Sequence, residues 1–118
     1  LNNASYYGRV FARSGGVRDA VEEVLRELEI KPEQFQLKPL ACSGLEECKL
    51  ALLKASKGIL EENFIEGMAC EQGCIGGPGC LTHGPKEKAM VDKYGRLALE
   101  KKVKDAVVIF DVLGGAVE

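Results

Sequence analysis

Cysteine and glycine residues are concentrated in one short stretch of the chain, residues 66–84. Three of the five cysteines (Cys70, Cys74 and Cys80) and the only histidine, His83, lie within it. Thiolates on a glycine-rich loop suit a bound inorganic cofactor, because glycine lets backbone N–H groups approach a cluster closely and hydrogen-bond its sulfur atoms. The composition of this stretch therefore predicts a metal-binding loop.

The same residues are compatible with more than one metal. Cys70, Cys74, Cys80 and His83 form a set of three cysteines and one histidine, which is a permitted composition for tetrahedral structural zinc. Their spacing does not match a familiar zinc-finger signature. For Cys80 three roles stay open: a further metal ligand, a group beside the ligands, or a free thiol.

The chain before the loop begins with residues 1–15, which read as polar and irregular, and then predicts a helix. Apolar residues recur at three- and four-residue spacing from Val17 to Leu28, with charged residues on the opposite face. Ser14 is a candidate N-cap, and Pro32 follows just beyond the expected end near Ile30.

A strand–helix–strand unit is expected next. Residues 35–42 and 59–68 predict strands, and residues 45–57 predict a helix that Gly58 closes. Such a unit gives a parallel sheet, whose ligands bind beyond the carboxyl ends of the strands. The residues expected to face inward from the helix are Leu45, Cys48, Ala51, Leu52 and Ala55.

Two cysteines outside the loop are interpreted as small buried hydrophobic residues, namely Cys42 and Cys48. Cys42, like Cys70, also lies at the carboxyl end of an expected strand, so both could face one site.

Helices are expected on the C-terminal side of the loop as well. Pro85 opens one that runs through Tyr94, with Gly95 as a candidate kink, and residues 97–113 continue at helical spacing. For residues 106–110 a strand is the alternative. The expected fold class is α/β, with a βαβ core, a short parallel sheet, flanking helices and a glycine- and cysteine-rich loop.

Composition limits the classes of function. The chain has 118 residues, of which 46% are hydrophobic, so residues 1–118 are expected to form a single domain. It begins at Leu1 rather than Met, so we expect it to be a domain cut from a longer protein. A net charge of −2 argues against nucleic acid or an anionic membrane as partner. Clustered cysteines in odd number, with no signal peptide or membrane span, favour a reducing, cytoplasmic location.

Residues 66–77 resemble the last of three signature motifs of the iron-only ([FeFe]) hydrogenases. The family's version runs Met-Ala-Cys-Pro-Gly-Gly-Cys and leads into a glycine run that ends in Gln-Pro. Here Met68-Ala69-Cys70 and Gly73-Cys74 match it, while Glu71-Gln72 replaces Pro-Gly and Cys80 stands where the family typically has Gln. Residues 10–20 are similar to the family segment that opens a helix with Ser/Thr-Gly-Gly-Val.

The resemblance implies a cofactor and residue roles. In this family the active-site H-cluster joins a [4Fe–4S] cubane to a two-iron site. Cys70 would ligate the cubane, Cys74 would bridge it to the two-iron site, and Met68 would line the pocket beside the irons. The N–H groups around Gly73, Gly76 and Gly77 would hydrogen-bond cluster sulfur.

The resemblance also implies what this chain needs from elsewhere. The family's other two motifs, which supply further cluster cysteines, are not in this sequence, so the isolated chain is expected to be inactive and can be metal-free. The implied function of the parent, a divergent or sensory-type member, is interconversion of protons, electrons and hydrogen, or sensing of hydrogen or redox state. Its implied partners are the remainder of the hydrogenase-like polypeptide and a ferredoxin-type electron carrier. The alternative is a non-catalytic iron–sulfur or zinc module for electron transfer or regulation, with Cys80 as third ligand.

Overall fold

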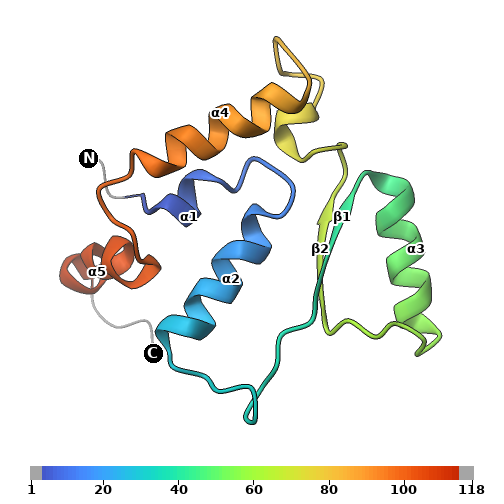
Figure 1. Ribbon diagram of the computed structural model, residues 1–118, viewed down its shortest axis with the longest axis horizontal. Coiled ribbons are helices and arrows are strands. Elements are labelled where there is room, and N and C mark those ends of the chain that lie inside the picture. Colours follow the sequence, from blue (N-terminus) through green and yellow to red (C-terminus); the bar gives the residue numbers. More distant parts are fainter. Residues whose placement is uncertain (1–3, 115–118) are drawn as a thin grey trace.

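The computed structural model describes the backbone of residues 4–114 and the side chains of residues 4–110. It is a mixed α/β structure of five helices and a short sheet of two parallel strands (Figure 1). The elements in chain order are α1 (Tyr6–Arg9), α2 (Gly16–Glu27), β1 (Pro39–Ser43), α3 (Leu45–Ser56), β2 (Phe64–Met68), α4 (Pro85–Arg96) and α5 (Val103–Gly114).

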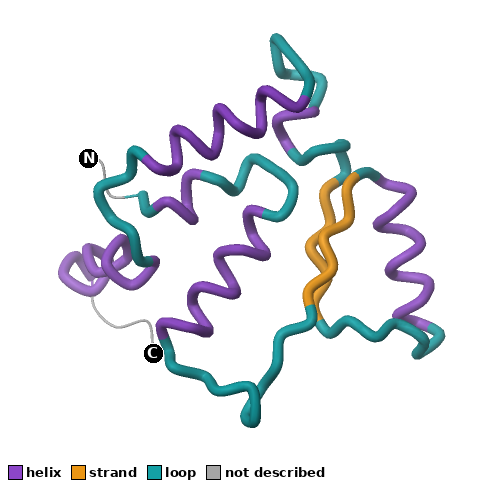
Figure 2. Tube along the Cα trace, viewed as in Figure 1, coloured by secondary structure: helices purple, strands orange, loops and turns teal. Residues whose placement is uncertain are grey.

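The predicted βαβ unit is confirmed. Strand β1 pairs in parallel with β2, in a register that runs from Pro39 opposite Phe64 to Ser43 opposite Met68. Figure 2 shows both strands ending at the same edge, where the chain enters α3 and the cysteine-rich loop.

The strands are shorter than predicted, because residues 35–38 and 59–63 lie outside them. Just before the strands, one backbone bond from the Asn63 N–H to the Lys38 carbonyl at 2.9 Å is supplemented by bonds of the Asn63 side chain. Asn63 Oδ1 accepts a hydrogen bond from the Lys38 N–H at 2.7 Å, and Asn63 Nδ2 donates to the Gln36 carbonyl at 2.9 Å. Pro39, which lacks an N–H, then opens the strand.

Helices α2 and α3 lie on opposite sides of the sheet (Figure 1). The predicted bounds of α3 are confirmed within a residue, and Gly58 follows it with a φ of +69°. Its predicted inward face is only partly right. Ala51 is buried, but Leu45 is 68% exposed and Leu52 61% exposed. Ala55 is exposed too. A sheet of two strands covers only a narrow stripe of the helix.

The N-terminal residues are more ordered than the sequence predicts. Helix α1 begins after Ser5, whose Oγ accepts the Gly8 N–H at 3.1 Å. Val10 is fully buried. It packs against Gly95 of α4, where a β-carbon would lie 2.9 Å from Val10 Cγ1. Gly95 therefore serves close packing near the end of α4 rather than a kink.

Residues 97–113 do not form one helix, and the strand alternative for residues 106–110 is wrong. The chain is non-helical until α5 begins at Val103. A carboxylate from α2 sets that start: Glu27 accepts the N–H groups of Val103 at 2.7 Å and Lys104 at 2.9 Å. The side chain of Leu113, the last residue of the stretch predicted at helical spacing, lies outside the described side chains.

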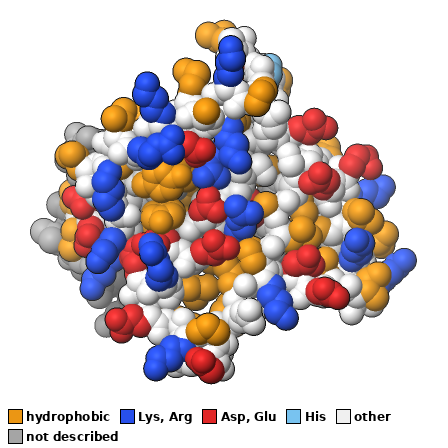
Figure 3. All heavy atoms as spheres, viewed as in Figure 1, with side chains coloured by type: hydrophobic (Ala, Val, Ile, Leu, Met, Phe, Trp, Pro, Cys, Tyr) orange, Lys and Arg blue, Asp and Glu red, His pale blue; other side chains and the backbone are white. Residues whose placement is uncertain are grey.

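The core is thin. The buried hydrophobic side chains among the described residues are Val10, Ala20, Cys42, Ala51 and Ala98, most of them small. The radius of gyration is 16.1 Å, whereas a compact domain of this length has one of about 13.5 Å. Figure 3 shows hydrophobic side chains at the surface among interspersed acidic and basic ones. No helix in the described part of the chain is long and apolar enough to cross a membrane.

Candidate cysteine site

The cysteine-rich loop leaves β2 at the carboxyl edge of the sheet and leads to α4. It contains one turn of 3₁₀ helix, Cys74–Gly76. Three hydrogen bonds fasten it to other segments. The Gln72 N–H donates to Ser43 Oγ at 2.7 Å. The Ser14 N–H donates to the Gln72 carbonyl at 2.9 Å, and the Ile75 N–H donates to the Ala12 carbonyl at 3.1 Å. The loop is thus held between the end of β1 and the segment before α2.

Two glycines make this close contact possible. Gly73 has a φ of +88°, and a β-carbon on it would lie 2.7 Å from the Ser14 nitrogen. At Gly76 a β-carbon would lie 1.8 Å from the Glu71 carbonyl oxygen. Any side chain at either position would collide with backbone, so both glycines fix the path of the loop around Cys74.

The three loop cysteines and His83 gather around Gly77. A β-carbon on Gly77 would lie 3.5 Å from Cys70 Sγ and 3.1 Å from the Cys74 carbonyl oxygen. The Cys80 thiol donates to that same Cys74 carbonyl at 3.1 Å, and His83 Nε2 lies 2.8 Å from the Gly77 carbonyl oxygen. Cys74 is exposed, whereas Cys70 and Cys80 are half-buried.

This gathering does not amount to a complete metal site. Among the described residues, no group of three or more His, Cys, Asp and Glu side chains is placed to hold a metal ion. Since His83 already bonds a backbone carbonyl and Cys80 points at another, this arrangement gives no support to the zinc set of Cys70, Cys74, Cys80 and His83.

The N–H groups of the three candidate glycines donate within the loop. Gly73 donates to the Cys70 carbonyl at 3.1 Å, Gly76 to the Gly73 carbonyl at 3.0 Å and Gly77 to the Cys74 carbonyl at 3.0 Å. These bonds shape consecutive tight turns. The role of Gly73, Gly76 and Gly77 toward cluster sulfur stays a prediction.

The remaining candidate residues lie outside the loop, on the two strands and on α3. Met68 is the half-buried last residue of β2, and its carbonyl accepts the Gly44 N–H at 2.8 Å. Cys42 is only 2% exposed and lies by Ala51 of α3, and burial raises the pKa of its thiol. Cys48 is half-buried, with its thiol 3.6 Å from the Met68 carbonyl oxygen. The structure thus places Cys42 under α3 rather than in the loop cluster.

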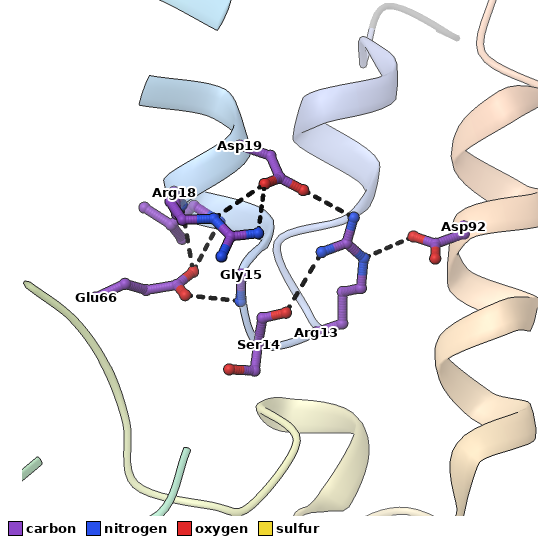
Figure 4. Close-up of polar contacts among 8 residues, drawn as sticks. Arg13, Ser14, Gly15, Arg18, Asp19, Glu66 and Asp92 are labelled. Atoms are coloured by element: carbon purple, nitrogen blue, oxygen red, sulfur yellow. Dashed lines mark hydrogen bonds and ion pairs between the residues drawn. The ribbon is translucent and has the colours of Figure 1, made fainter. Parts of the chain in front are cut away.

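Sequence reasoning missed a buried carboxylate, Glu66, on β2. It is 4% exposed and points at the N-terminus of α2 (Figure 4). Its carboxylate accepts the N–H groups of Gly15 at 2.6 Å, Val17 at 2.8 Å and Arg18 at 3.4 Å. Glu66 therefore caps α2 in place of Ser14, the predicted N-cap, because Gly15 with its φ of +87° precedes the helix. The only sequence signal was its position between Ile65 and Gly67 in an expected strand, which weakly indicates burial but does not identify a partner.

A buried arginine, Arg13, joins the same region to α4 (Figure 4). It is 6% exposed and pairs with Asp19 of α2 at 2.9 Å and with Asp92 of α4 at 2.6 Å. Burial alone would lower the pKa of the Arg13 guanidinium, but hydrogen bonds to Asp92 and Asp19 outweigh it and raise that pKa. Arg13 therefore stays charged and ties three segments together.

The residues present fit an iron–sulfur group in part. Cubane clusters are held by four cysteine thiolates, and this loop carries two cysteines of the family motif, the half-buried Cys70 and the exposed Cys74. Iron in such a cluster would supply electron transfer. The exposed Cys74 suits a cluster that this chain shares with another protein segment.

The fold and the loop define a class: an α/β protein that carries a cysteine cluster at the carboxyl edge of parallel strands. The family model for the iron only hydrogenase large subunit, C-terminal domain, matches residues 1–78. The match covers both strands, α1 to α3, Cys70 and Cys74, and the chain belongs to this family. A search of curated proteins found no match.

Proposed function

We propose that this chain supplies Cys70 and Cys74 as ligands to the iron–sulfur H-cluster of a hydrogenase-like protein. Cys70 holds the [4Fe–4S] cubane, Cys74 bridges the cubane to a two-iron site, and Met68 lines the pocket beside it. The protein then interconverts protons, electrons and hydrogen, or senses hydrogen or redox state.

One observation carries the proposal. In a chain of the iron only hydrogenase family, both cysteines lie on the loop that directly follows β2, at the edge where parallel sheets bind ligands. The hydrogen bonds from Ser14, Gln72 and Ile75 fix the path of this loop through contacts within the protein itself. A preformed loop lowers the cost of ordering ligands when the cluster binds.

A second protein segment must complete the site, since two cysteines are half of a cubane's ligands. The apolar surface of α3 supports such a partner, because Leu45, Leu50 and Leu52 are all more than half exposed. We assign this role to the remainder of a hydrogenase-like polypeptide, in which this chain is one part of the catalytic domain. A ferredoxin-type carrier would exchange electrons with the assembled site.

Metal analysis of the native protein, purified without oxygen, tests the proposal. We expect iron and acid-labile sulfide, with broad visible absorption that is lost in Cys70→Ser and Cys74→Ser. Cys48→Ser is the matched control, because Cys48 is a half-buried thiol outside the loop and should leave the iron content unchanged. Zinc in place of iron, or full iron content in both loop variants, would contradict the proposal.

A further inference from the structure

Cys80 has no counterpart in the signature motif that Cys70 and Cys74 match, and yet it lies against one of these residues. Its Sγ is 3.1 Å from the Cys74 carbonyl oxygen. Two successive turns bring the residues together, since the Gly77 N–H donates to the Cys74 carbonyl at 3.0 Å and the Cys80 N–H to the Gly77 carbonyl at 3.2 Å.

We propose that Cys74 and Cys80 are a thiol–disulfide exchange site, which low-molecular-weight disulfides such as oxidised glutathione convert into an intramolecular disulfide. This inference stands on the contact of the Cys80 thiol with the backbone of Cys74 and does not depend on iron.

The chain between the two cysteines can accommodate the bond. Disulfide-bonded residues have Cα atoms about 4.4–6.8 Å apart and a defined torsion about the sulfur–sulfur bond. The five intervening residues include Gly76, Gly77 and Gly79, and a β-carbon on Gly79 would meet nothing within 4 Å. The open space around Gly79 leaves room for the backbone rotation that forming the bond requires.

The exposure of the two thiols sets the order of the steps. Cys74 is exposed and Cys80 half-buried. The Cys74 thiolate attacks one sulfur of oxidised glutathione, forming a mixed disulfide and releasing one glutathione thiolate. The Cys80 thiolate then attacks the Cys74 sulfur, the protein disulfide forms, and the second glutathione leaves. Two protein thiols are oxidised, one glutathione disulfide is reduced to two thiols, and the protons pass from the former to the latter.

A consequence follows that does rest on the proposed function. A Cys74 sulfur that is bonded to Cys80 cannot bind iron, so oxidation of the empty loop would block cluster insertion until a thiol reduces the bond. Exposed disulfides are the readily reduced ones, so the block would be reversible.

Peptide mapping of the metal-free chain tests the exchange site. The reduced protein is equilibrated with mixtures of reduced and oxidised glutathione, free thiols are alkylated, and the digest is analysed by mass spectrometry. We expect a peptide in which Cys74 is linked to Cys80, with Cys42, Cys48 and Cys70 alkylated. A link between Cys70 and Cys74, or glutathione on Cys74 and Cys80 without a link, would overturn the proposal.

Two variants sharpen the test. Cys80→Ser removes the second attacking thiol, so glutathione should remain attached to Cys74, whereas Cys48→Ser should behave as the unchanged protein does. Iron loading under reducing conditions is measured separately on the native protein. Cys80→Ser should load iron fully. Loss of iron in this variant would make Cys80 a further ligand and contradict the ligand set of the proposed function, not the exchange site, which the map decides. Because the map uses no iron, its failure is distinguishable from failure of the cluster proposal.

Discussion

Two glycines in the cysteine loop differ sharply in what surrounds them. A β-carbon on Gly76 would lie 1.8 Å from the Glu71 carbonyl oxygen, whereas on Gly79 it would meet nothing within 4 Å. We expect Gly76→Ala to force the backbone beside Cys74 apart and to lower the free energy of unfolding by about 1–3 kcal/mol, the usual range for overpacking. Gly79→Ala is the matched control and should change little. Urea denaturation of both variants measures the difference, and equal stability would contradict the placement of Gly76.

The buried carboxylate of Glu66 makes a second prediction for a single residue. Replacing Glu66 by Gln keeps one acceptor but turns an amide NH₂ toward backbone N–H groups that now have no partner. We expect Glu66→Gln to lower the free energy of unfolding by about 1–3 kcal/mol, the cost of leaving a buried donor unpaired. The variant Glu61→Gln changes the same atoms on an exposed side chain just before β2 and should be nearly neutral. Similar midpoints in thermal melts of the two variants would count against the capping role.

At the scale of elements, periodicity predicted the parts of the fold that depend on short-range pattern. The start of α2, the bounds of α3 within a residue, the start of α4 at Pro85 and the parallel pairing of β1 with β2 are confirmed, whereas α2 ends at Glu27, before the expected end near Ile30. The errors lie where a distant side chain decides a boundary. The Asn63 side chain bonds the chain just before β1 and so marks where regular strand pairing starts, and Glu27 sets where α5 begins. Local spacing carries no information on such partners, because Glu27 and Val103 are 76 residues apart.

In the candidate site, too, local sequence pattern predicted some features, while features that depend on distant partners could not be predicted. The motif predicted which cysteines lie on one loop, and the structure brings Cys70, Cys74 and Cys80 around Gly77. The interpretation of Cys42 as a small buried residue is confirmed. The motif could not show that α3 covers Cys42, since that depends on which face of β1 the helix packs against. Nor could it predict the Glu66 cap, because a lone acidic residue in a strand gives no hint of its partner.

The cap of α5 by Glu27 predicts a dependence of stability on pH. Burial would raise the pKa of the Glu27 carboxyl, but the hydrogen bonds from the Lys104 and Val103 N–H groups outweigh it and lower that pKa. A group with a lowered folded pKa stabilises the protein above its unfolded pKa, about 4.3 for Glu, and loses this effect as the pH falls through the folded value. The stability difference between the unchanged protein and Glu27→Gln should thus be present at neutral pH and shrink below about pH 4.

Urea denaturation of both proteins across this pH range measures the effect. Glu33→Gln, on an exposed side chain after α2, is the control and should show no such trend. A difference between the Glu27 variant and the unchanged protein that stays constant from neutral to acid pH would contradict the cap.

At the scale of the whole molecule, α4 and α5 lie beyond residue 78, where the match to the hydrogenase family ends. With so thin a core, their attachment depends on a few long-range contacts. Arg13 pairs with Asp92 across 79 residues of sequence. The Arg9 guanidinium lies 4.4 Å from the centre of the Tyr94 ring, and Gly95 packs on Tyr6. Each of these joins the segment around α1 to α4.

If these contacts hold α4 in place, Asp92→Asn should loosen α4 without unfolding the sheet. The variant removes the charge that faces Arg13, while Asp19 still pairs with the guanidinium, so we expect the stability of α4 to fall by about 1.5–3 kcal/mol, the range for a hydrogen bond to a charged group. Amide hydrogen exchange measures this by region. Exchange should become faster in α4 and stay unchanged in β1, β2 and α3.

Asp105→Asn, on an exposed side chain of α5, should leave all four elements unchanged. Equal acceleration in α4 and in the sheet would mean that α4 unfolds only with the rest of the molecule, so that Arg13 stabilises one cooperative unit rather than a separate attachment.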